Sequence, residues 1–184
     1  VRHGGDADLS PISLFDSRWV REQLPLSERR KGTPLAHYLE SGGSLEKGPH
    51  PLFDASWYAS EYLGADASEF DAFVHFVEEG AASGSDPNPL FYSAWYRDFY
   101  AEHFARETPS ITHYLKIGHV RGLSPNPLFN PDYYLAQAGV DLSPGETALT
   151  HYFRTGMKRQ YPPSELFWFC LQFFRSKTGQ RDRR

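Results

Sequence analysis

The chain has 184 residues, a length that fits one compact domain or a short array of repeats, and its aromatic content of 16% excludes a disordered polypeptide. With 19 basic and 23 acidic side chains it has a formal net charge of -4, which gives no reason to expect nucleic acid as a partner, because phosphate binding requires clustered Lys and Arg. The single cysteine, Cys170, excludes an internal disulfide and any multi-cysteine zinc site.

A pattern with a period of 38 residues runs through the chain. Leu-Phe pairs recur at this interval, and each of the first four is followed by a histidine, a glycine and a closing proline. The pairs are Leu14-Phe15, Leu52-Phe53, Leu90-Phe91, Leu128-Phe129 and Leu166-Phe167; the histidines are His37, His75, His113 and His151; the glycines are Gly42, Gly80, Gly118 and Gly156; the prolines are Pro49, Pro87, Pro125 and Pro163. A fixed period of this length is typical of stacked repeat architectures.

The pattern predicts an all-α fold of tandem two-helix repeats, four complete units and a partial fifth, stacked as a short solenoid-like array. Along the chain we expect a flexible lead-in over residues 1–10, the repeat domain over 11–165, an apolar capping helix or truncated fifth unit over 166–174, and a basic tail over 175–184. Because the chain begins with Val1 and its one methionine is Met157, we expect it to be a segment of a longer protein.

The first helix of each unit is predicted to begin after the Leu-Phe pair. Asp16, Asp54 and Asn130 stand at the N-cap position, whereas the third unit has Tyr92 there and breaks the rule. An apolar residue lies on either side of each start with the spacing of a hydrophobic staple. The four staple pairs are Phe15 with Val20, Phe53 with Tyr58, Phe91 with Tyr96, and Phe129 with Tyr134.

The second helix of each unit is expected to begin at a short polar residue and to carry the recurring histidine. The expected caps are Thr33-Pro34, Ser68 with Asp71, Ser110, and Ser143-Pro144 with Glu146. The glycine that recurs after this helix stands where a left-handed C-terminal residue is expected. Proline-containing stretches then follow as stiff connectors between units.

The recurring histidines (His37, His75, His113 and His151) are the first candidate binding residues. In one interpretation they are structural and pair with backbone groups of a neighbouring loop. In the other they form a row that faces a ligand. We do not expect a metal site, because equivalent positions on stacked helices lie about 8–10 Å apart, too far for one ion to be shared.

An aromatic ladder on the first helices is the second candidate site, and it consists of Trp19, Trp57, Trp95 and Tyr133. These rings either belong to the core, where aromatic side chains supply much of the buried area, or form a surface that stacks on sugar rings or on the apolar groups of a partner. We predict no catalytic residues and no cofactor, because no nucleophile–base arrangement, P-loop or dinucleotide fingerprint is present.

The C-terminal stretch offers two interpretations of its own. No apolar run is long enough to span a bilayer. Residues 165–174 either pack as a helix on the fourth unit or lie in a membrane interface, with the basic tail drawn to anionic lipid. The aromatic residues concerned are Phe167, Trp168, Phe169, Phe173 and Phe174. The expected location is the cytoplasm, with the inner face of the membrane as the alternative.

Over about residues 11–167 the units resemble the short repeats that accompany bacterial glycosyltransferases of surface-polysaccharide synthesis. The pattern of those repeats stands at Pro51 through Trp57-Tyr58, and again at His113-Tyr114-Leu115 to Gly118, ending in Pro125-Asn126-Pro127-Leu128-Phe129. The resemblance implies a non-catalytic module that positions a glycosyltransferase domain or docks its glycan acceptor. The alternatives are a scaffold for a protein partner and a peripheral membrane-associated module.

Overall fold

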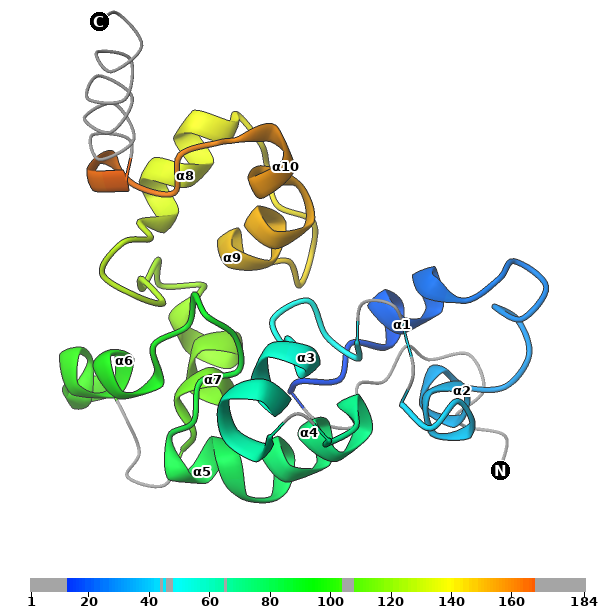
Figure 1. Cartoon of the computed structure of the whole chain (residues 1–184). Coiled ribbons are helices and arrows are strands. Elements are labelled where there is room, and N and C mark those ends of the chain that lie inside the picture. Colours follow the sequence, from blue (N-terminus) through cyan, green and yellow to red (C-terminus); the bar gives the residue numbers. More distant parts are fainter. Residues whose placement is uncertain (1–12, 44, 46–47, 65, 104–107, 168–184) are drawn as a thin grey trace, which may run out of the picture. The chain divides into compact units, whose positions relative to one another are not determined.

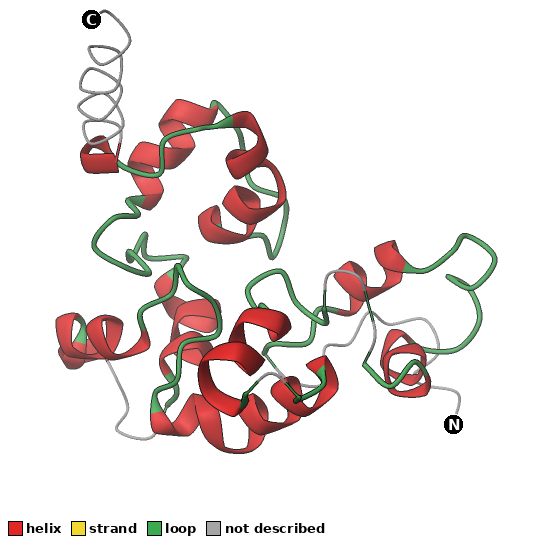
Figure 2. Ribbon diagram, in the orientation of Figure 1, coloured by secondary structure: helices red, strands yellow, loops and turns green. Residues whose placement is uncertain are grey.

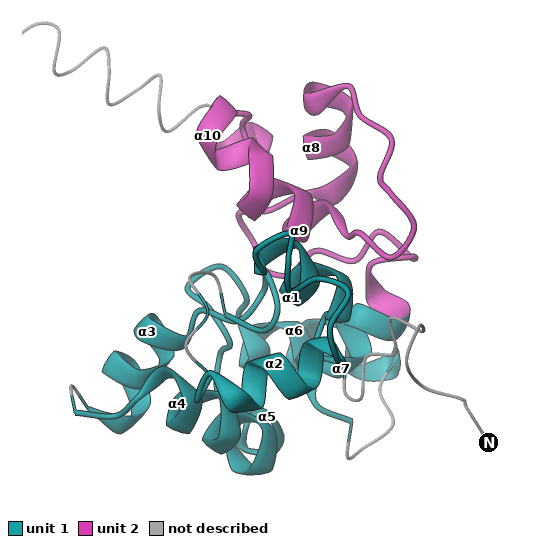
Figure 3. Cartoon of the chain, turned by 90° about the vertical axis from the view of Figure 1, so that its right-hand side faces the viewer, with its two compact units in different colours: residues 1–116 teal, residues 117–184 magenta. Residues whose placement is uncertain are grey.

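The computed structural model describes residues 13–43, 45, 48–64, 66–103 and 108–167. Over these ranges the chain consists of helices joined by turns and loops, without strands (Figure 2). The predicted all-α class is therefore confirmed for the described residues. The expected lead-in over 1–10, most of the 166–174 segment and the basic tail lie outside them. The chain divides into two compact units, residues 1–116 and 117–184 (Figure 3).

The first helix of each repeat follows the Leu-Phe pair, as predicted (Figure 1). These helices are α1 (Ser17–Gln23), α3 (Ala55–Tyr58) with its π-helical extension η1 (Ala59–Leu63), α6 (Ser93–Phe99) with the 3-10 turn η3 (Ala101–His103), and α8 (Pro131–Ala138). In three repeats these helices end at a residue that leaves right-handed helical geometry: Leu24 is extended, Gly64 has a φ of 106° and Gly139 is left-handed.

The second helices contain a π-helical turn directly after the recurring histidine in the last three repeats. They are α2 (Pro34–Glu40); α4 (Glu69–His75), η2 (Phe76–Gly80) and α5 (Ala81–Ser83); α7 (Ser110–His113) and η4 (Tyr114–Gly118); and α9 (Ala148–His151), η5 (Tyr152–Gly156) and α10 (Met157–Arg159). Within each repeat the first helix packs on the second: α1 on α2, α3 on α4, α6 on α7, and α8 on α9.

The predicted caps of the first helices are confirmed. The side chains of Asp16, Asp54 and Asn130 each accept a hydrogen bond from the backbone N–H three residues later, at 3.0, 3.0 and 3.1 Å. The hydrophobic staples also form in the last three repeats, with ring centroids 5.4–5.5 Å apart. Each first helix thus begins with a local cap, an aromatic contact across its start, or both.

Helix α6 of the third repeat is capped from a distance. Tyr92 makes no capping hydrogen bond, and the carboxylate of Asp86 accepts one from the Ser93 N–H at 2.6 Å instead. Burial raises the pKa of Asp86 above its ordinary value. A residue seven positions before Ser93 therefore compensates in part for the missing cap.

The caps of the second helices are partly as expected. Thr33 accepts from the Ala36 N–H, and Ser68 with Asp71 forms a complete capping box. The prediction is wrong for the other two repeats. In the third, Ser110 is the first helical residue, and its hydroxyl donates to the Ser93 carbonyl at 2.9 Å. In the fourth, Thr147 replaces the expected Ser143, because Thr147 and Thr150 form a reciprocal capping box.

The first, second and fourth repeats are each closed by a backbone hydrogen bond between their start and their end. The N–H of the first-helix N-cap donates to the carbonyl of the closing proline: Asp16 to Pro49 at 3.0 Å, Asp54 to Pro87 at 3.0 Å, and Asn130 to Pro163 at 2.9 Å. Inside this closure each repeat buries its own aromatic cluster. In the second repeat the Phe53 ring lies 5.3 Å from those of Phe73 and Phe76, centroid to centroid.

The described chain ends at the start of the predicted fifth unit. Residues 165–167 are helical, and the Phe167 N–H donates to the Ser164 hydroxyl at 3.2 Å. Phe167 is 36% exposed, whereas the phenylalanines at the same position of the four complete repeats are buried. Leu166 is 62% exposed; at its position Leu14 and Leu52 are buried, but Leu128 is 47% exposed. The remaining aromatic residues of the predicted membrane-facing stretch, from Trp168 onward, lie outside the described residues.

Candidate functional site

The recurring histidines bond to tyrosines of the first helices. In the last three repeats the histidine Nδ1 lies within hydrogen-bond distance of a tyrosine hydroxyl from the same repeat. The pairs are Tyr58 with His75 at 2.9 Å, Tyr96 with His113 at 3.0 Å, and Tyr134 with His151 at 2.6 Å. Because each bond joins the two helices of one repeat, these histidines have a structural role in the fold.

The first repeat lacks this pairing because Val20 replaces the tyrosine. His37 instead donates from Nε2 to the backbone carbonyl of Lys31, in the loop before its own helix. His113 is buried, whereas His37, His75 and His151 are half-buried. The row of histidines is thus held by internal bonds in all four repeats.

The recurring glycine has a different role from the one that the sequence predicts. Gly42 is left-handed with a φ of 63°, as expected, but Gly80 and Gly156 have right-handed helical angles, so the expected left-handed end is wrong there. A Cβ on Gly80 would overlap the Tyr58 hydroxyl, and one on Gly156 would overlap that of Tyr134. The tyrosine, histidine and glycine therefore form one packing unit, which is repeated along the chain.

The left-handed ends of these helices lie four residues further on. They are Gly84 with a φ of 89°, Gly122 with 68°, and Gln160 with 56°. In the second and fourth repeats the helix continues past the π-helical turn before it ends, because the turn leaves the glycine in ordinary helical geometry.

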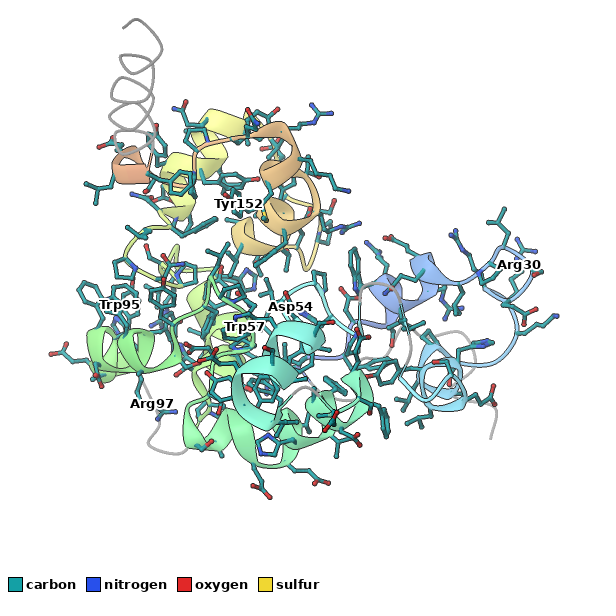
Figure 4. The ribbon with its side chains drawn as sticks, viewed as in Figure 1. Arg30, Asp54, Trp57, Trp95, Arg97 and Tyr152 are labelled. Carbon is teal, nitrogen blue, oxygen red and sulfur yellow. The ribbon has the colours of Figure 1, made fainter. Side chains whose placement is uncertain are left out.

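The aromatic ladder lies at the edge of the core. Its members, Trp19, Trp57, Trp95 and Tyr133, are all half-buried, whereas the residue that follows each of them is fully buried. Trp57 makes an edge contact with the Tyr62 ring at 6.0 Å, and Trp95 stacks on Phe99 at 4.8 Å. Figure 4 labels Trp57 and Trp95 on the first helices of their repeats. The ladder residues are thus partly accessible to a ligand.

The connectors contain polar residues that the sequence analysis did not single out. The buried side chains of His50, Asn88 and Asn126 occupy equivalent positions, and each accepts a hydrogen bond from the N–H two residues later, at 3.0, 2.8 and 2.7 Å. Asn88 also donates to the Leu52 carbonyl at 2.9 Å. The signal in the sequence that could have identified them is the recurrence of a polar residue between two prolines in each connector.

Tyr38 provides a test of how the second helices pack. Its side chain is 1% exposed, and within the described residues its hydroxyl has no hydrogen-bond partner. Phe76 occupies the equivalent position in the second repeat. We expect Tyr38→Phe to leave the melting temperature unchanged or to raise stability by about 1 kcal/mol, since it removes an unsatisfied buried hydroxyl.

Calorimetry of Tyr38→Phe and Tyr96→Phe, side by side, checks this expectation. Tyr96→Phe should lower stability by about 1 kcal/mol, because it breaks the hydrogen bond to His113. Equal losses of stability in the two variants would contradict the conclusion that the Tyr38 hydroxyl is unsatisfied and the Tyr96 hydroxyl is hydrogen-bonded.

Three further findings bear on the chemistry of the chain. Within the described residues, no three His, Cys, Asp or Glu side chains gather as a metal-binding group. Over the same ranges, no helix combines the length and apolar character needed to cross a membrane. Comparisons with protein-family models, curated proteins and solved structures give no match.

Proposed function

We propose that this chain is a non-catalytic helical repeat module of a bacterial surface-polysaccharide protein, which positions a glycosyltransferase domain or docks its glycan acceptor. The half-buried aromatic ladder is the observation that carries the proposal. It places one accessible aromatic ring at the same point of every first helix. In this proposal the repeats stack as a solenoid-like array, so that the rings recur at regular intervals.

The internal bonds of the histidines support the ladder as the docking surface. His75, His113 and His151 each bond to a tyrosine of the same repeat, so their recurrence follows from the fold. The recurrence of the ladder follows less directly from packing, because the adjacent residue of each repeat fills the core. An aromatic face with its negative charge density suits the C–H face of a sugar ring.

Fluorescence titration of the full chain with bacterial polysaccharide fragments tests this function. We expect a saturable change in tryptophan emission, and about tenfold weaker binding on Trp57→Ala. Val77→Ala is the matched control, because Val77 is an exposed apolar residue on the second helix of the same repeat. Unchanged affinity after replacement of every ladder residue would reject glycan docking.

A scaffold for a protein partner is the second candidate function. Leu26 is 80% exposed and Val120 is 74% exposed, so apolar side chains other than the ladder are available for contact. This alternative predicts a protein partner that binds in the absence of sugar. Its binding should be lost in the Leu26→Ser or the Val120→Ser variant. The same titration with Trp57→Ala separates the two functions, because the scaffold predicts no response to polysaccharide.

A further inference from the structure

The third repeat departs from the other three at two positions of its first helix, and both changes replace a polar residue by an aromatic one. Tyr92 stands where the other repeats have the caps Asp16, Asp54 and Asn130. Phe99 stands where they have Gln23, Glu61 and Gln137. Comparison within one chain thus singles out α6.

Neither replacement serves the helix. Tyr92 makes no capping hydrogen bond, and loss of an N-cap costs about 1 kcal/mol, which the distant contact from Asp86 offsets in part. Phe99 is 65% exposed, so most of its apolar surface stays in water. A role outside the fold of this repeat accounts for both residues.

Phe99 lies on the same face of α6 as the ladder residue Trp95, four positions earlier, and Tyr92 is the N-cap residue directly before the helix. Tyr92, Trp95 and Phe99 form an aromatic stripe, in which Tyr92 and Phe99 are exposed and Trp95 is half-buried. Figure 4 shows Trp95 and Arg97 on opposite sides of this helix. Trp95 and Phe99 therefore lie on the same side of α6, away from Arg97.

The stripe is held in place by further rings. Trp95 and Phe99 stack with centroids 4.8 Å apart and planes inclined by 18°. Tyr100 meets the Phe99 ring edge-on at 5.0 Å and packs on the buried Tyr96 at 5.1 Å. An exposed ring fixed in this way loses little conformational freedom when a ligand binds.

Carboxylates border one edge of the stripe. Asp98 and Glu102 are both exposed. Asp98 lies on α6 directly before Phe99, away from the core side, and Glu102 lies in the 3-10 turn η3 that follows the helix. An ionised carboxylate only accepts hydrogen bonds. The surface therefore combines flat apolar rings with a row of acceptors.

We propose that this stripe binds a neutral oligosaccharide, which packs against Tyr92 and the outer side of the stacked Trp95–Phe99 pair and whose hydroxyls donate to Asp98 and Glu102. This inference rests on the proposed function and assigns glycan docking to the third repeat. The C–H face of a pyranose suits the negative face of an aromatic ring, and its hydroxyl edge suits the carboxylates. The carboxylates repel an acidic polysaccharide.

Calorimetric titration of the full chain with cellohexaose, chitohexaose, mannohexaose and hexagalacturonate tests the proposal. We expect saturable binding of at least one neutral hexasaccharide. Phe99→Gln, which copies the first and fourth repeats, should weaken that binding about tenfold. Tyr92→Asp should weaken it as well while raising the melting temperature, because aspartate restores the N-cap. A more stable variant with weaker binding cannot be explained by misfolding.

Trp57→Ala separates failure of this inference from failure of the proposed function. If Trp57→Ala weakens binding and neither α6 variant does, glycan docking stands and the assignment to the third repeat is overturned. If no neutral hexasaccharide binds, both are overturned. Equal binding of hexagalacturonate rejects the preference for neutral sugars, and a copurifying protein that Phe99→Gln releases assigns the stripe to a protein partner instead.

Discussion

Replacing Gly80 with alanine is expected to destabilise the protein by about 3 kcal/mol. Gly80 has ordinary right-handed helical angles, with φ of −61° and ψ of −42°, where alanine normally stabilises a helix by about 1 kcal/mol. Here the new methyl group would overlap the Tyr58 hydroxyl and press on the Phe76 ring. Both rings are fully buried, and Tyr58 is also held by its hydrogen bond to His75. Urea denaturation followed by circular dichroism measures the loss.

Two control variants identify the cause of this loss. In a Tyr58→Phe background the hydroxyl is absent, so Gly80→Ala should cost clearly less. Gly42→Ala should cost only about 1 kcal/mol, because a Cβ on Gly42 meets no atom within 4 Å and only its φ of 63° is unfavourable. Equal costs at Gly42 and Gly80, or no rescue by Tyr58→Phe, would show that the glycine does not act through the tyrosine.

The start of each first helix was predictable because the signals are local. A cap such as Asp54 bonds to an amide three residues later, and its staple joins Phe53 to Tyr58 across the same turn. The all-α class followed from the repeat itself. The third repeat was recognised as an exception at Tyr92, but its substitute cap was not, because Asp86 lies in the preceding connector.

The second helices were harder to predict because tertiary contacts decide their geometry. The sequence places a glycine after an apolar helical run, which favours a left-handed end. Gly80 is instead explained by a tyrosine on the neighbouring helix, and the π-helical turn Phe76–Gly80 brings the two together. A pattern with a period of 3.6 residues does not contain that turn.

The two candidate sites differ in how far the sequence defined them. Both interpretations of the histidines were open, and the structural one required knowing that a tyrosine lies opposite His75, His113 and His151. For the aromatic ladder the sequence could not decide between core and surface, since Trp57 at the edge of the core has features of both. Docking of glycan at these rings stays a prediction.

The buried connector histidine, His50, is expected to make the protein less stable in acid. Burial lowers the pKa of His50 from about 6.5 to about 4, and the nearby Asp16 carboxylate opposes only part of that effect. Between these two values the unfolded chain binds a proton that the folded chain does not. The contribution of neutral His50 to stability is therefore fully present above pH 6.5 and is lost as the pH drops from 6.5 to 4. The loss at pH 4 is about 3 kcal/mol.

His50→Asn should remove this contribution, because Asn88 and Asn126 fill the same connector position and accept the same backbone hydrogen bond. Urea denaturation of both proteins at pH 7, 5.5 and 4 gives the difference between their free energies of unfolding. The effect of His50 can be read from that difference, since the carboxylates titrate in both proteins. The variant should gain about 3 kcal/mol relative to the natural chain at pH 4 and little at pH 7. His103→Asn, at an exposed histidine, should change neither value. If the free energy of unfolding varied with pH in the same way for the natural chain and for His50→Asn, His50 would not be buried in its neutral form. Another group would then govern stability in acid.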